Sequence, residues 1–393
     1  MIRGAILERS GLEIYLDNNA TTQVHPKACA AMLNVMGEGY GNPSSAHRAG
    51  EKTRRALFVA RSNVAELFGC LSENVVFGSG ATELNNWILN GLCNNPDAHL
   101  ITTTVEHPSI LRAAAQIEQK GGKVTYLPVD SNGLINLEDL EDSISSRTAL
   151  VSVQWINGET GVIQDVKSIA SICASANVKL HCDSAQAFGK ININISEVRV
   201  DFLTCSAHKL HGPTGVGAAY CREFSGLRPL IAGGSQEFGL RAGTENIPGI
   251  VGFGVSAQLR REDFTNINKQ VQELRDRFES AILTNIPAAR VNGTSGYRSH
   301  NTSNICFEGI DGQALIAILD RLGLRCSQSS ACSSQIPEPS HVLIAMGLSE
   351  RDAYSSVRFS MSQLNTQKEI DAAVELVTKR VMKLRETKVG INA

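Results

Sequence analysis

The sequence predicts an α/β protein with a mostly parallel sheet, followed by a smaller α+β domain at the C-terminal end. Short apolar, β-rich segments alternate with longer helical patterns from about residue 74 onward, and those segments are apolar throughout their length. Continuous apolar strands that alternate with helices are typical of a parallel sheet covered on both faces. Near residue 260 the alternation ends, and a long charged amphipathic helix begins a different pattern.

The elements of the first region are predicted in chain order from periodicity and from turn residues. Apolar residues at helical spacing, such as Leu84, Trp87 and Ile88, indicate a helix over 81–92. The next helix is expected over about 107–122, because Pro108 lies near its start and glycines lie at its end. We expect strands at 74–80, 99–105, 148–154, 178–184, 201–208 and 216–221.

The second region begins with the helix predicted over 261–283, which we interpret as the link between two domains. Beyond it we expect a strand at 301–307, a helix at 311–323, a strand at 355–361 and a final helix from about 366. The expected domains are a large one over 19–258 and a small one over 259–393. We expect residues 1–18 to pack with the small domain.

Composition excludes several classes of protein. The chain has 393 residues, is 42% hydrophobic and carries a net charge of −2, so nothing favours direct binding to nucleic acid or to an anionic membrane. It has no apolar run of transmembrane length, and Arg3, Glu8 and Arg9 interrupt any signal-peptide core. Its 10 cysteines are scattered without a CxxC pair, which predicts a reducing, cytoplasmic compartment and no metal site.

Lys209 is a candidate for covalent chemistry. It follows a predicted strand and precedes a glycine-rich turn in CSAHKLHGPTGVGAAY, residues 205–220. Ligands bind at the carboxyl ends of strands in open α/β sheets, and a partly desolvated lysine there can form an imine with an aldehyde cofactor. Ser206 and His208 flank it and could bind a phosphate. A plain surface lysine and a serine hydrolase, from the S-x-x-K spacing, remain alternatives, although no partner motif follows.

Further polar positions lie at the ends of neighbouring strands. Asp183 ends an apolar strand, where a carboxylate needs a partner such as a protonated pyridine nitrogen, unless it caps the next helix. Ala81 and Thr82 begin a helix, and free amides at a helix start bind phosphate. His107 occupies the next strand-to-helix junction, where an imidazole can stack on a ring and move protons, or be structural. Together with Lys209 these positions could converge on one phosphorylated aldehyde.

The motifs and their order resemble the NifS/IscS-like cysteine desulfurases, which belong to the class V aminotransferase family of pyridoxal 5'-phosphate (PLP) enzymes. The resemblance runs from about residue 14 to 380. It implies fold type I, with a mostly parallel seven-stranded sheet in the large domain, a smaller α+β C-terminal domain, and a cytoplasmic homodimer. The segments that carry it are LDNNATT, GNPSSAH, SGATELNN, VEHPSI, NGETGVIQDV, HCDSAQAFGK, SAHKLHGPTGVG, GLRAGTEN, SSACSS with PEPSHVL, and VRFS.

The resemblance also implies a role for each candidate. Lys209 would hold PLP, Asp183 would pair with its pyridinium, and Gln186 would contact the ring hydroxyl. His107 would stack on the ring and help manage protons, and Arg358 would bind the substrate carboxylate through its guanidinium fork. The phosphate would be held by Ala81, Thr82, Ser206 and His208, and by Thr244 reaching across from the neighbouring subunit.

Cys332 is the expected nucleophile. It lies in RCSQSSACSSQIPEPS, residues 325–340, among small polar residues that suit a mobile loop. As a thiolate it would take sulfur from L-cysteine, release alanine and pass the persulfide to an acceptor protein such as an iron–sulfur scaffold or a tRNA-thiolation carrier. Cys326, six residues earlier, is expected to be structural.

Two positions depart from the family pattern. Gly158 stands where similar enzymes have an asparagine that helps hold the ring oxygen and the substrate. Asn157 is retained and is counted as a substrate-binding candidate, although its side chain should point elsewhere. Phe238 replaces an arginine, and a role in dimer contacts stays open.

Other functions remain open at this stage. A selenocysteine lyase, a cystine lyase or an aminotransferase-like enzyme would share the lysine and the aspartate, and a non-catalytic sulfur-assembly scaffold would share the fold. The SSACSS segment favours the desulfurase. The sequence does not name the sulfur acceptor.

Overall fold

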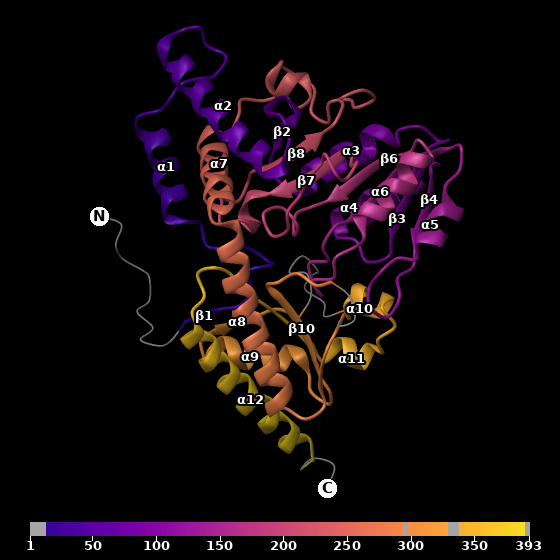
Figure 1. Ribbon diagram of the computed structural model, residues 1–393, viewed down its shortest axis with the longest axis vertical. Coiled ribbons are helices and arrows are strands. Elements are labelled where there is room, and N and C mark those ends of the chain that lie inside the picture. Colours follow the sequence, from indigo (N-terminus) through magenta and orange to yellow (C-terminus); the bar gives the residue numbers. More distant parts are fainter. Residues whose placement is uncertain (1–12, 294–296, 329–337, 390–393) are drawn as a thin grey trace.

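The computed structural model describes residues 13–293, 297–328 and 338–389, with side chains up to residue 386. Its large domain is built on a seven-stranded sheet of order β2-β8-β7-β6-β5-β3-β4 (Figure 1). Strand β8 pairs antiparallel with both neighbours, and the other pairs are parallel, so the predicted mostly parallel sheet is confirmed. The strands are β2 (Val75–Gly78), β3 (His99–Thr103), β4 (Lys123–Leu127), β5 (Thr148–Gln154), β6 (Lys179–Asp183), β7 (Phe202–Ser206) and β8 (Gly217–Cys221).

Both faces of this sheet are buried under helices, which explains why its strands are apolar throughout. Val76 and Leu100 belong to a core that includes α3 and α4, whereas Val75 and Ile101 belong to a second core that includes α2, α6 and α7. Alternate side chains of each strand therefore enter different cores. The helices of this domain are α1 (Pro26–Gly37), α2 (Arg48–Phe68), α3 (Ala81–Leu92), α4 (Pro108–Gln119), α5 (Leu137–Ser143), α6 (Val166–Ser175) and α7 (Ile247–Glu262), with short 3₁₀ turns η1 (Ser72–Asn74), η2 (Ala207–Lys209) and η3 (Gln236–Gly239).

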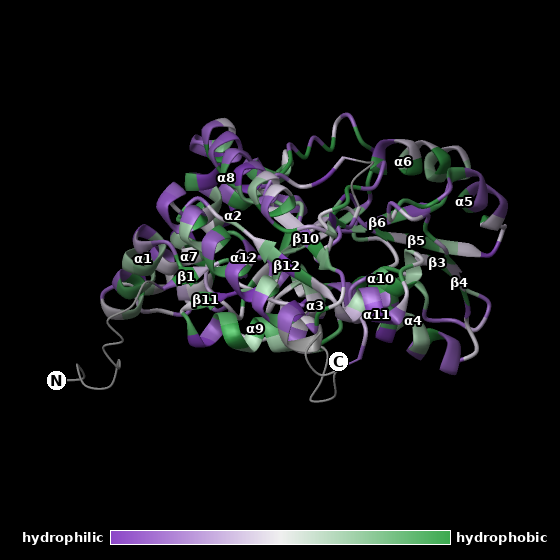
Figure 2. Ribbon diagram, turned by 90° about the horizontal axis from the view of Figure 1, so that it is seen from below, coloured by the Kyte–Doolittle hydropathy of each residue, from purple (hydrophilic) through white to green (hydrophobic). Residues whose placement is uncertain are grey.

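The C-terminal part forms a separate core around a three-stranded antiparallel sheet of order β12-β10-β9. Phe359 packs against Phe278 and Phe307, with ring centroids 4.8 and 6.4 Å apart. In Figure 2 the outer helix α8 shows many hydrophilic residues, whereas α9 beside the sheet shows hydrophobic ones. The elements are α8 (Phe264–Asn285), β9 (Ala289–Val291), β10 (Thr302–Phe307), α9 (Gly312–Arg321), α10 (His341–Ala345), α11 (Glu350–Tyr354), β12 (Ser356–Ser360) and α12 (Gln367–Val389).

The N-terminal strand joins this second core rather than the large sheet. Strand β1 (Ile14–Tyr15) pairs in parallel with β11 (Leu324–Arg325), and Asp17 forms a bridge with Ser360. Ile14 and Leu16 are fully buried among the side chains of the C-terminal core. From Glu13 onward the chain therefore passes through the small domain before it enters the large one.

The predicted linking helix is observed as α8, which begins at residue 264 rather than 261. α7 ends at Glu262 and α8 begins at Phe264, with Asp263 between them in a non-helical conformation (φ −126°, ψ 29°). Residues 261 and 262, expected at the start of the link, thus belong to the large domain's last helix. Within the described ranges no helix is both long and apolar enough to cross a membrane.

Candidate active site

One pocket brings together predicted site residues from both parts of the chain. Lys209, His107, Gln186 and Arg358 all line it, as does Asn157. The first three follow the carboxyl ends of β7, β3 and β6, which point to the same edge because these strands run in the same direction. Arg358 comes from β12, so the pocket lies between the two domains.

Lys209 is held by Asn19 and Ala20, in the segment that leads from β1 into the large domain. It ends the 3₁₀ turn η2 directly after β7, and its Nζ donates to the backbone oxygens of Asn19 at 2.5 Å and Ala20 at 2.8 Å. Asn19 is 2% exposed, and its own side chain donates to Gly158 O and Thr302 Oγ1. Sequence reasoning missed Asn19, although it lies in the LDNNATT motif.

Asp183 is a buried carboxylate held by neutral donors. It ends β6, is 6% exposed, and accepts from Asn85 Nδ2 at 2.8 Å and from the Ala185 amide at 2.9 Å. Asn85 is oriented in turn by Thr204 Oγ1, which donates to it, and by Ser109 Oγ, which accepts from it. A cationic group would be a favourable further partner for this carboxylate.

Two of the predicted phosphate ligands, Ala81 and Ser206, meet where α3 begins. The Ala81 amide donates to Ser206 Oγ at 2.8 Å. Gly217 permits this approach, because a Cβ there would lie 2.7 Å from Gly80 Cα. His208 shares a hydrogen bond of 3.1 Å with Thr21 Oγ1, and burial together with the charge of Lys209 lowers its pKa to about 4, so its ring is neutral at pH 7. Thr82 and Thr244 are exposed.

His107 caps helix α4 with its ring. Nδ1 accepts from the Ser109 amide at 3.1 Å, so the proton of the neutral ring lies on Nε2. Burial lowers the pKa of His107, and the nearby carboxylate of Asp183 offsets part of that shift. The ring is therefore neutral at physiological pH and keeps one N–H to donate.

Arg358 reaches the pocket from the small domain and is almost completely buried. Its Nη2 pairs with Asp17 Oδ1 at 2.6 Å, and its Nη1 donates to Gly158 O at 3.0 Å. Its Nε is buried and has no hydrogen-bond partner among the described residues. A buried guanidinium with an unsatisfied N–H retains the capacity to bind a carboxylate.

The two adjacent residues 157 and 158 differ in what they offer the pocket. Asn157 Oδ1 accepts from the amides of Glu159 and Thr160, and its Nδ2 donates to Val105 O, so the side chain is engaged by its own turn and by the segment after β3. Gly158 faces Gln186, and a Cβ built on it would lie 3.4 Å from Gln186 Nε2 in ordinary contact. The backbone thus has room for a side chain at position 158.

Cys332 lies outside the described residues, but both flanks of its segment are anchored. On the upstream side Gln328 Nε2 donates to Tyr354 O at 2.6 Å. On the downstream side Ser340 Oγ donates to Glu159 Oε2 at 2.5 Å, and His341 Nε2 lies 3.0 Å from Glu106 O at the rim of the pocket. Cys326 is buried, and burial raises its pKa well above the ordinary value, as expected for a structural thiol.

Comparison with known proteins identifies the family. The aminotransferase class-V family matches residues 14–373. "Cysteine desulfurase 2" of Trichormus variabilis is 44% identical over 374 residues, which cover 95% of this chain and 94% of that protein. The chain belongs to the cysteine desulfurases. A solved NifS-like protein has a TM-score of 0.89 at 35% identity, over 95% of this chain and 100% of its own. SspA, solved in complex with cysteine, has a TM-score of 0.80 at 33% identity, and the match covers 90% of this chain and 100% of the SspA chain.

A cysteine desulfurase of this family depends on PLP, and the donor set of the pocket fits that cofactor. The buried carboxylate of Asp183 matches a protonated ring nitrogen, and the Ala81 amide beside Ser206 at the start of α3 matches a phosphate. The unsatisfied Nε of Arg358 matches the carboxylate of an amino-acid substrate.

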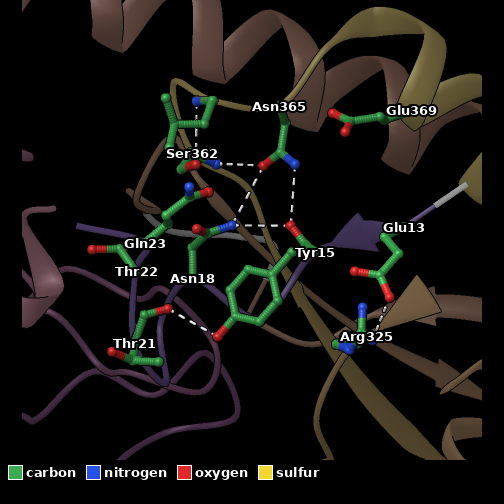
Figure 3. A pocket seen from close by; sticks show the side chains of 11 residues that line it. Glu13, Tyr15, Asn18, Thr21, Thr22, Gln23, Arg325, Ser362, Asn365 and Glu369 are labelled. Atoms are coloured by element: carbon green, nitrogen blue, oxygen red, sulfur yellow. Dashed lines mark hydrogen bonds and ion pairs between the residues drawn. The ribbon is translucent and has the colours of Figure 1, made fainter. Parts of the chain in front are cut away.

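A second, larger pocket has no part in this chemistry. It lies where β1 meets the small domain, and its polar side chains are satisfied mainly by one another (Figure 3). Asn18 Nδ2 donates to Tyr15 O, Asn365 Nδ2 donates to the same oxygen, and Arg325 pairs with Glu13 at 3.1 Å. This network attaches the N-terminal segment of the desulfurase to its small domain.

Proposed function

We propose that the desulfurase carries sulfur on Cys332 and passes it to an acceptor protein, with Lys209, Asp183, His107, Gln186 and Arg358 serving the cofactor and substrate. The convergence of four of these residues on one interdomain pocket carries the proposal. SspA, a structural relative, was solved with cysteine, which supports L-cysteine as the substrate here.

Binding of L-cysteine would use charge from both domains. Arg358 would receive the carboxylate, because its Nε lacks a partner and its Nη atoms are held by Asp17 and Gly158. Asp183 would keep the ring nitrogen of PLP protonated. Ala81, Thr82, Ser206 and His208 would hold the phosphate, and Thr244 of the neighbouring subunit would complete that site.

The protons would be moved by two groups at the carboxyl edge of the large sheet, after β7 and β3. When bound, PLP supplies an electron sink that makes the Cα–H and Cβ–S bonds of the substrate labile. Lys209 Nζ would take the Cα proton, since its amine is held at the pocket by backbone oxygens. His107 would donate or accept a proton at Nε2, because its Nδ1 already accepts a hydrogen bond from the Ser109 amide.

The sulfur transfer needs a thiolate that can approach the substrate. The Cys332 thiolate would attack the substrate sulfur, forming an S–S bond as the Cβ–S bond breaks, and protonation of the former Cβ would give alanine. The cysteines whose side chains are buried cannot do this, because burial raises their pKa. A reducing cytoplasm suits such a thiol, and the nine cysteines in the described ranges are free.

We also propose a homodimer, supported by exposed apolar side chains at one end of the large domain. Leu33 and Met36 of α1 are each 63% exposed, Phe58 of α2 is 61% exposed, and Phe238 of η3 is 55% exposed. Helix α2 contacts η3 directly, through the pair of Arg61 with Glu237. Large apolar side chains this exposed are candidates for an interaction site. Analytical ultracentrifugation should give twice the mass of the chain.

Turnover of the purified holoenzyme tests the substrate assignment. Alanine release should be faster from L-cysteine than from selenocysteine or cystine, and it should stop in Cys332→Ala while the yellow cofactor stays bound. Faster release from cystine, or full activity in Cys332→Ala, would favour a lyase. The absence of both a cofactor band and any turnover would favour the non-catalytic scaffold.

A further inference from the structure

A second lysine lies behind the cofactor pocket, and the reaction described above does not use it. Lys190 follows β6 by seven residues and is 9% exposed. Its Nζ donates to Gln186 Oε1 at 2.6 Å and to Asn19 Oδ1 at 3.0 Å. Both acceptors are neutral amide oxygens, which is unusual for a buried lysine because burial of a charge normally requires an ionised partner.

The surroundings of Lys190 favour its uncharged form. The charged groups that face it in the described part of the chain are cationic: Lys209, Arg358 and Arg260. His211 and His300 lie around the same cavity. Burial first, and then these cations, lower the pKa of Lys190 well below its ordinary value. A neutral amine has two N–H groups, and the two amide oxygens match that number.

The hydrogen bonds of Lys190 determine which way the Gln186 amide points. Because Oε1 accepts from Lys190, Nε2 must point the other way, and it donates to Asn19 O at 3.0 Å. That oxygen also accepts from Lys209 Nζ. The amide therefore presents its N–H side toward Lys209 and the pocket.

We propose that Lys190 is a positioning residue, which fixes Gln186 with its Nε2–H toward the cofactor and so sets the protonation behaviour of the bound cofactor. The proposal rests on the role given to Gln186 and Lys209 under the proposed function. Without the amine, Gln186 can rotate and present its oxygen instead. Loss of the hydrogen-bond donor to the ring oxygen of PLP favours the protonated form of the cofactor. The pH midpoint of its visible absorption band should therefore rise.

The test uses Lys190→Met, which keeps the length of the side chain and removes the amine. In the purified holoenzyme the midpoint of the visible band should rise by about one pH unit, and the dissociation constant for PLP added to apoenzyme should rise about tenfold. Lys179 is half-buried, lies at the opposite end of β6 from the pocket and donates to Ser225 O, so it provides the control, and Lys179→Met should leave both values unchanged. Should Lys190→Met fail to fold, Lys190→Gln is too short to bridge both oxygens and should shift the midpoint in the same direction.

A double variant separates positioning from simple stabilisation. Gln186→Ala alone should raise the midpoint, and adding Lys190→Met should cause no further rise if the lysine acts through the glutamine. Additive shifts, or an unchanged midpoint in Lys190→Met, would overturn the proposal. If the wild-type protein shows neither a cofactor band nor turnover, the proposed function fails instead, so the two failures are distinguishable.

Discussion

Asp17 Oδ1 lies 2.6 Å from Arg358 Nη2, although the two residues are 341 positions apart in the chain. The other carboxylate oxygen of Asp17 accepts from Ser327 Oγ at 2.9 Å, just before the segment that carries Cys332. The aspartate therefore orients the proposed substrate-binding arginine and contacts the base of the segment that holds the proposed nucleophile.

Replacing Asp17 with asparagine should weaken substrate binding, because the buried guanidinium loses its ionised partner and its fixed orientation. We expect KM for L-cysteine to rise about tenfold, and the free energy of unfolding to fall by about 2–4 kcal/mol. Steady-state kinetics and urea unfolding measure the two effects. Ser327→Ala is the control, since it removes only the hydroxyl, and its KM should stay within about twofold of wild type. Equal KM values in wild type and Asp17→Asn would contradict this role.

Gly158→Asn should strengthen the site. A Cβ at position 158 makes ordinary contact with Gln186, so the backbone there can accept a side chain at its Cβ. One added hydrogen bond to the cofactor should lower the PLP dissociation constant about tenfold. Gly158→Ala fills the same position without an amide and should behave as wild type. Weaker PLP binding in the asparagine variant would mean that this pocket has adapted to the glycine.

Glu106 should make the stability of the enzyme depend on pH. It is fully buried, and burial raises its pKa from 4.5 to about 8, with the Asp183 charge adding to the shift. The folded state thus binds the proton more tightly than the unfolded state, and stability falls as pH rises from about 4.5 toward 8. Between pH 6 and pH 8 the loss should be about 2 kcal/mol.

Glu106→Gln removes this ionisation while preserving the shape of the side chain. Urea unfolding of wild type and variant at pH 6 and pH 8 should show a stability difference that shifts in favour of the variant at the higher pH. Parallel pH profiles for the two proteins would indicate that Glu106 does not titrate in this range.

The chain order of strands and helices was sufficient to predict the large sheet and the positions of several site residues. Lys209, Asp183 and His107 follow apolar strands, and parallel strands necessarily bring their carboxyl ends to one edge. The break between α7 and α8 was missed because Asp263 is neither glycine nor proline and interrupts no periodic pattern. Helices α1 and α2 were not predicted, because they precede the first predicted strand and no alternation of strands and helices marks that part of the sequence.

The residues that support the site could not be predicted in the same way, because their roles depend on contacts between distant segments. Asn19 Oδ1 accepts from Lys190, 171 positions away, and from Asn301, 282 positions away. The pair of Asp17 with Arg358 requires the N-terminal strand to pack on the small domain. Local periodicity carries no information about such contacts, and only the resemblance to a family directed attention to the LDNNATT motif.

The most direct test of the whole account is the mass of the peptide that contains residue 332, measured before and after the holoenzyme reacts once with L-cysteine. We predict that this peptide gains the mass of one sulfur atom, in step with the release of one alanine. The peptide containing Cys29, which is the exposed thiol among the nine cysteines in the described ranges, should be unchanged. Alanine release with no added sulfur on the Cys332 peptide, or with the sulfur on Cys29, would contradict the assignment of Cys332 as the sulfur carrier.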